Sequence, residues 1–112
     1  MNHWLYRLHP IRPEMLRNGL TKHEAEVVGR HFTYLEQLVS AGVVVMAGRT
    51  LNNDESAFGI VVLRAPSEAE AREVMRNDPA VAAGVMRADL FPYRIAILSA
   101  SGWPEVAAHI KP

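Results

Sequence analysis

Residues 43–63 read VVVMAGRTLNNDESAFGIVVL, and this stretch decides the fold. It begins with a β-branched run over residues 43–48 and ends with a second apolar run over residues 57–63, both typical of strands. Residues 50–56 between them are polar and contain the turn-forming sequence NND. The stretch therefore predicts a β-hairpin. Each of its strands is apolar on both sides, whereas the strands of a sheet with one solvent-exposed face alternate apolar and polar residues.

The residues that precede the hairpin predict one strand and one long helix. Residues 3–9 alternate in the period-two pattern of a strand, and the prolines that follow predict a connecting loop over residues 10–20. Thr21 and Glu24 have the spacing of a capping box, so a helix is expected to begin there. Its apolar residues recur on one side at helical spacing, and Gly42 suits its C-terminal end.

The residues that follow the hairpin predict a second helix and a last strand. A second capping box at residues 67–70 begins the helix, which has to stop before Asp78 because a proline follows that residue. Residues 85–90 and 93–98 read as one strand interrupted by Pro92, and a proline within a strand implies an edge position or a bulge.

The order strand, helix, hairpin, helix, strand predicts an α+β fold, the ferredoxin-like β-α-β-β-α-β plait, in which both helices cover one face of an antiparallel sheet. We expect one domain over residues 1–100 and a C-terminal tail over residues 101–112. Because the uncovered face of the sheet is also apolar, we expect a second copy of the chain to cover it, which makes the protein a homodimer.

Composition excludes several classes of function. The chain has 112 residues and no cysteine, so disulfides, thiolate zinc sites and a cysteine nucleophile are excluded. Twelve Lys and Arg balance twelve Asp and Glu without a basic cluster, so we expect no nucleic-acid partner. No apolar run is long enough to cross a bilayer and no signal segment precedes the first strand, so we expect a cytoplasmic protein without a membrane partner.

His31 and Asp78 are the candidate site residues. His31 lies in the apolar sector of the first helix, where it is either a packed core histidine or a catalytic group whose ring is oriented by a carboxylate. Asp78 is placed to be that carboxylate, because the plait lays both helices on the same sheet face. Asp78 before Pro79 is also the usual arrangement for capping a short helical turn, here over residues 79–83. The histidines lack metal-binding spacing, so we expect no metal site.

Five segments carry a recognisable pattern, namely residues 31–35 (HFTYL), 41–42 (AG), 47–48 (AG), 58–62 (FGIVV) and 78–85 (DPAVAAGV). Together they resemble the YciI-like (YCII-related) family. Arg49 stands where many members have proline, and the segment over residues 10–20 is longer than in shorter members. The resemblance implies a dimeric α+β barrel with a cleft that contains a histidine from the first helix and the aspartate of the Asp-Pro turn, which match His31 and Asp78.

The function that follows is a cofactor-independent enzyme in which His31 acts as general acid or base on a small cyclic or phenolic substrate, with Asp78 orienting it. This is lyase or isomerase chemistry, and some relatives are implicated in removing chloride from chlorinated hydroxyquinols. The alternative is a non-catalytic module that binds or senses a small molecule in the same cleft. A third class, the monooxygenases that share the dimeric plait, has no specific support in the sequence.

Overall fold

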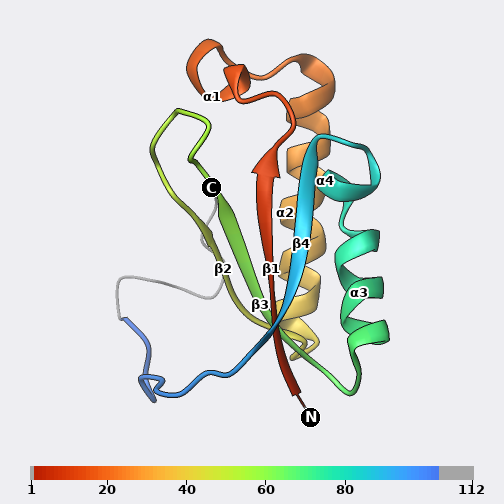
Figure 1. Ribbon diagram of the computed structural model, residues 1–112, viewed down its shortest axis with the longest axis vertical. Helices are drawn as coiled ribbons and strands as arrows, with labels where there is room; N and C mark the ends of the chain where they lie inside the picture. Colours follow the sequence, from red (N-terminus) through yellow and green to blue (C-terminus); the bar gives the residue numbers. More distant parts are fainter. Residues whose placement is uncertain (1, 104–112) are drawn as a thin grey trace.

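The computed structural model describes residues 2–103 and contains one antiparallel sheet with helices on one side of it (Figure 1). The element order confirms the predicted α+β plait, with one additional short helix before the first long helix and another after the second. The elements are β1 (Asn2–Pro10), α1 (Glu14–Asn18), α2 (Lys22–Ser40), β2 (Val44–Arg49), β3 (Gly59–Ala65), α3 (Glu68–Asn77), α4 (Pro79–Ala82) and β4 (Met86–Tyr93).

The sheet has the strand order β2-β3-β1-β4, so β1 and β3 are central and β2 and β4 are the edges. All three pairings are antiparallel, and the β2/β3 hairpin contains a register shift between Val44 and Met46. The hairpin strands lie one or two residues further along the chain than the apolar runs predict. Thr21 forms the predicted capping box with Glu24 at the start of α2, and Ser67 accepts a hydrogen bond from the Glu70 N–H at the start of α3.

The main core lies between the sheet and the long helices. β1 contributes alternate residues to it, as the period-two pattern predicts, and α2 and α3 contribute Leu35 and Met75. The opposite face of the sheet is uncovered within the described chain. It combines apolar side chains with an Arg7–Asp89 ion pair at 3.8 Å, and Arg7 also lies over the ring of Phe91. The uncovered face is therefore less uniformly apolar than the sequence predicts. The buried β1 residues are Trp4, Tyr6 and Leu8.

The predicted loop over residues 10–20 is wrong in part, because it contains α1. Five residues are too few to display a helical period in sequence, and this helix is held by tertiary packing. Its Met15 is 3% exposed and packs in a second core cluster with Val27, Ala80 and Val85. The segment is thus a folded part of the domain, and it packs against α2 and the helical turn that follows α3.

The predicted last strand is correct to Tyr93 and wrong beyond it. β4 runs without interruption through Pro92, which faces Trp4 in the register. β4 is an edge strand, which agrees with the edge position that a proline within a strand predicts. Residues 94–98 form no strand, and the chain leaves the sheet there (Figure 1). Most of the predicted tail, residues 101–112, lies outside the described residues.

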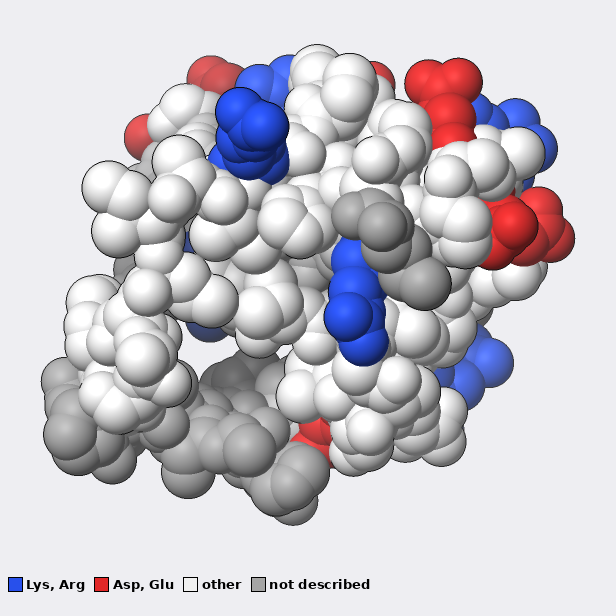
Figure 2. All heavy atoms as spheres, turned by 90° about the horizontal axis from the view of Figure 1, so that it is seen from below, with Lys and Arg blue, Asp and Glu red and all other residues white. Residues whose placement is uncertain are grey.

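Charged side chains are dispersed over the face of the molecule that is seen from below (Figure 2). Figure 2 shows that, seen from below, Lys and Arg stand apart from one another on a largely uncharged surface. The described part of the chain has no helix that is both long and apolar enough to cross a membrane.

Candidate active site

Asp78 lies at the junction of α3 and α4, and the fold buries it completely. Its Oδ1 accepts a hydrogen bond from the Ala80 N–H at 3.0 Å and lies 2.7 Å from Nδ1 of His31. Its Oδ2 accepts a bond from the Tyr6 hydroxyl at 2.7 Å. Both interpretations of Asp78 from the sequence therefore describe the same side chain, because one carboxylate caps α4 and also contacts His31.

The structure brings His31 and Asp78 together although 47 residues separate them in the chain. His31 lies in the middle of α2 on the side that faces α4. Its side chain is 15% exposed, whereas that of Asp78 is 0% exposed. An ionised carboxylate can only accept, so Nδ1 carries the proton in this contact and Nε2 of the neutral ring is left with a lone pair. The partly exposed ring is therefore arranged to accept a proton at Nε2.

Tyr6 is a site residue that the sequence did not predict, since the pattern placed it only among the alternating residues of the first strand. It projects from β1 toward the helices and is 0% exposed. Burial, followed by the negative charge of Asp78, raises the pKa of the Tyr6 hydroxyl far above its usual range. Tyr6 is therefore a donor at neutral pH. A buried tyrosine hydroxyl needs a hydrogen-bond partner, and that requirement was the available signal.

Tyr34, one turn after His31 on α2, ties the two long helices together. Its hydroxyl donates to the carbonyl of Val74 on α3 at 2.7 Å. Burial, together with the charges of Asp78 and Glu73, raises the pKa of Tyr34 to about 12. The contacts of Tyr6 and Tyr34 thus fix β1, α2 and α3 around the buried carboxylate. Because His31 is part of α2, its ring is held at a defined place relative to the sheet.

Two surface hollows lie away from this site. The larger, about 450 Å³, is at the end of the sheet where Trp4 and Tyr93 meet. The smaller, about 230 Å³, lies beside Met46 and Phe58 at the β2 edge. Neither hollow touches the pair of His31 and Asp78, which we call the dyad. In the single chain a small molecule can therefore approach the dyad only from the exposed side of the His31 ring. Within residues 2–103 no group of three metal-ligating side chains converges on one point.

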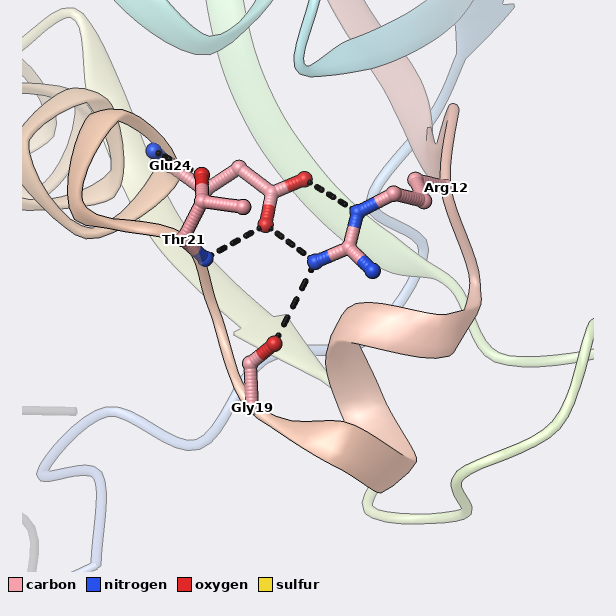
Figure 3. Close-up of polar contacts among 4 residues, drawn as sticks. All are labelled: Arg12, Gly19, Thr21 and Glu24. Carbon is pink, nitrogen blue, oxygen red and sulfur yellow. Dashed lines mark hydrogen bonds and ion pairs between the residues drawn. The ribbon is translucent and has the colours of Figure 1, made fainter.

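A second polar cluster holds the segment that contains α1 against α2. The Arg12 guanidinium donates to both carboxylate oxygens of Glu24, at 2.6 and 3.0 Å, and to the carbonyl of Gly19 (Figure 3). The same carboxylate completes the capping box by accepting from the Thr21 N–H at 2.8 Å. The contact of Arg12 with Glu24 was not predicted, because no sequence motif links two residues that are twelve positions apart in the chain. The cluster fixes α1, whose Met15 packs near the turn that Asp78 caps.

We expect the Arg12–Glu24 cluster to make stability depend on acid pH. The Arg12 bonds and the Thr21 N–H lower the pKa of Glu24 from 4.5 to about 2. A carboxyl with a lowered pKa stabilises the fold fully above its unfolded value, and that contribution is lost as the pH falls. Thermal unfolding of Glu24→Gln should therefore show a Tm deficit above about pH 5 that shrinks between pH 4.5 and pH 2.

Glu26→Gln is the matched control, since Glu26 is exposed on the same helix. Its Tm should follow that of the unmodified protein at each pH. A Tm deficit of Glu24→Gln that stays constant down to pH 2 would contradict a role for the ionised carboxylate.

Comparison with known proteins places the chain in a family. It is similar in structure to the 5-chloro-2-hydroxyhydroquinone dehydrochlorinase of Burkholderia phenoliruptrix AC1100, solved in complex with 2,5-dihydroxybenzoquinone, with a TM-score of 0.58 and 20% sequence identity. The similarity covers 81% of this chain and 93% of that one, and at this identity it shows the shared fold. No curated protein matches the chain. The model of the YCII-related domain matches residues 4–92, and the chain therefore belongs to the YCII-related family.

Proposed function

We propose that the chain is a cofactor-independent enzyme that acts on a small cyclic or phenolic substrate, with His31 as general acid or base and Asp78 as the group that orients it. The observation that carries the proposal is the 2.7 Å contact between Nδ1 of His31 and a fully buried carboxylate. Asp78 holds the ring in one tautomer, and Nε2 removes a proton from the substrate. This is lyase or isomerase chemistry, and it uses a single positioned side chain.

A chlorinated hydroxyquinol is the first substrate class to examine. The structural relative is named for removing chloride from such a compound, and the shared fold supports the analogy. In dehydrochlorination a base takes a hydroxyl proton, and the carbon that bears chlorine gains a proton as that oxygen becomes a carbonyl. Loss of a second hydroxyl proton then breaks the C–Cl bond, and chloride leaves with the electron pair. Because the proton and the chloride leave the same molecule, the step needs no external oxidant or reductant. His31 then returns the proton to water.

The test is chloride release from 5-chloro-2-hydroxyhydroquinone, followed with a chloride electrode and by quinone absorbance. Oxygen is excluded because hydroxyquinols oxidise in air. We expect release in proportion to the protein concentration and none from the same compound without chlorine, which has no leaving group. A protein that leaves the chlorinated compound and other phenols unchanged lacks the proposed activity.

The alternative is a non-catalytic module that binds or senses a small molecule in the same cleft. One observation favours it, because Asp78 ties together α2, α4 and β1 in the manner of a structural group. A ligand that binds only the native state raises the unfolding temperature. Saturating thermal shifts with phenols, without any product, would therefore support the binding module and contradict the enzyme.

We also propose that the protein is a homodimer joined through the uncovered face of the sheet. That face presents Met46 and Phe91, which are 47% and 41% exposed. Covering this face with a second copy buries these apolar side chains.

A further inference from the structure

The larger of the two surface hollows lies at the end of the sheet where β1 begins and β4 ends, at the lower end of the view in Figure 1. It is lined by residues 2–4 and by residues 92–95, and we call it the end hollow. Its volume of about 450 Å³ lies within the range of about 300–1,000 Å³ that is typical of small-molecule sites in proteins. The end hollow is therefore large enough for a molecule with one ring.

Hydrogen-bond donors dominate the polar part of this lining. Arg94 carries a permanent positive charge, and no Asp or Glu among residues 2–103 lies within ion-pair distance of it. Nδ1 of His3 accepts a hydrogen bond from the Ile95 N–H at 3.3 Å, so the proton of the neutral ring is on Nε2, which is a further donor. None of the described residues that line the end hollow is acidic. A cationic set of donors without a competing carboxylate is complementary to an anion.

The same hydrogen bond keeps Arg94 beside the end hollow. β4 ends at Tyr93, which pairs with His3 in the register of the sheet. The chain leaves the sheet after Tyr93, but the His3 side chain still holds the N–H of Ile95. The backbone of residue 94 therefore stays next to the start of β1, and Arg94 lies among the residues that line the end hollow.

The apolar part of the lining suits an aromatic ring. Trp4 and Pro92 face each other in the register of β1 and β4. Nε1 of Trp4 donates to the Ala65 carbonyl at 3.2 Å, so Trp4 offers ring atoms rather than a donor to the end hollow. Tyr93 is 46% exposed, and aromatic rings favour stacked or edge-to-face contacts with one another. A flat aromatic ligand therefore matches this lining better than a small inorganic ion does.

We propose that the end hollow binds a small aromatic carboxylate. The Arg94 guanidinium and the His3 Nε2–H donate to the carboxylate, because a guanidinium matches the planar geometry of that group and pairs with both of its oxygens. The ring of the ligand lies against Trp4 and Tyr93. The inference goes beyond the proposed catalytic function, since no residue that lines the end hollow belongs to the dyad.

Tryptophan fluorescence tests this placement, because Trp4 lines the end hollow. The chain has two tryptophans, so Trp103→Phe leaves Trp4 as the only reporter. Titration of this variant with sodium benzoate at neutral pH should give a saturating change in emission. Benzamide, which lacks the charge, and acetate, which lacks the ring, should each bind about tenfold or more weakly than benzoate. Benzamide that binds as tightly as benzoate would overturn the role of Arg94. Acetate or inorganic phosphate that binds as tightly would overturn the aromatic part of the proposal.

Substitutions in the same background locate the bound benzoate. Arg94→Gln should raise the Kd for benzoate by about tenfold or more, because it removes the charged donor. Arg49→Gln is the matched control, since Arg49 is also exposed but lines the smaller hollow, and it should leave the Kd unchanged. His31→Ala should leave the Kd unchanged as well. If His31→Ala weakens binding and Arg94→Gln does not, benzoate binds at the dyad, which overturns this inference and leaves the proposed enzyme in place. A titration without a saturating change in Trp4 emission would also overturn the inference.

Discussion

Replacing His31 with alanine should lower the turnover of a chlorinated hydroxyquinol by about 10²- to 10⁴-fold, which is the contribution that one positioned acid or base supplies. The loss is expected in kcat, because the proposed role of Nε2 is to handle the proton in the transition state rather than in the bound substrate. The dimer should persist, since His31 lies on the helical side of the sheet and the proposed interface is on the other side. Initial rates and light scattering on the same preparation measure the two effects.

His23→Ala is the matched control for this experiment. His23 lies on the same helix but is exposed in its first turn, so its replacement should leave kcat unchanged. Added imidazole should restore part of the lost turnover to His31→Ala, because a free base can occupy the vacated space. Equal kcat values for His31→Ala and the unmodified protein would exclude His31 as the acid or base, even if the protein releases chloride.

The sequence could predict the fold because each element has a local cause. The alternation of residues 3–9 and the Thr21 capping box act over a few residues, and the structure confirms both. The two short helices differ in this respect. The turn after Asp78 has a local signal in its Asp-Pro pair, whereas α1 exists through Met15 packing against distant residues and has none. Tertiary packing therefore marks the limit of the prediction.

The site was predictable only in part, for the same reason. A histidine in an apolar helix sector and an aspartate before proline are both visible in the sequence. Their contact requires that α2 and α3 pack side by side, and the plait supplies this. The sequence left the cap and the dyad as alternatives for Asp78, and neither excludes the other, because the carboxylate has two oxygens. The Tyr6 bond and the Arg12–Glu24 pair join residues 72 and 12 positions apart without any local pattern.

Replacing Asp78 with alanine should cost about 3–5 kcal/mol of unfolding free energy. The change leaves three buried or partly buried donors without an acceptor, on Tyr6, His31 and Ala80. Each unsatisfied buried group costs about 1–3 kcal/mol, and the lost helix cap is included in that sum. Typical domains have a total unfolding free energy of about 5–15 kcal/mol, so the variant should unfold at a much lower urea concentration than the unmodified protein. Both proteins are compared at one protein concentration, because a dimer's stability depends on it.

The part of this loss that belongs to the Tyr6 bond can be isolated with a double-mutant cycle. Tyr6→Phe alone should cost about 1–3 kcal/mol, because it leaves Oδ2 of a buried carboxylate without a donor. In Asp78→Ala the same bond is already absent, so adding Tyr6→Phe there removes a hydroxyl that has no partner and should cost little. Tyr34→Phe provides the contrast, since its hydroxyl bonds to a backbone carbonyl and should cost the same in both backgrounds. Additive losses for Tyr6→Phe and Asp78→Ala would mean that the Tyr6 hydroxyl does not stabilise the carboxylate that orients His31.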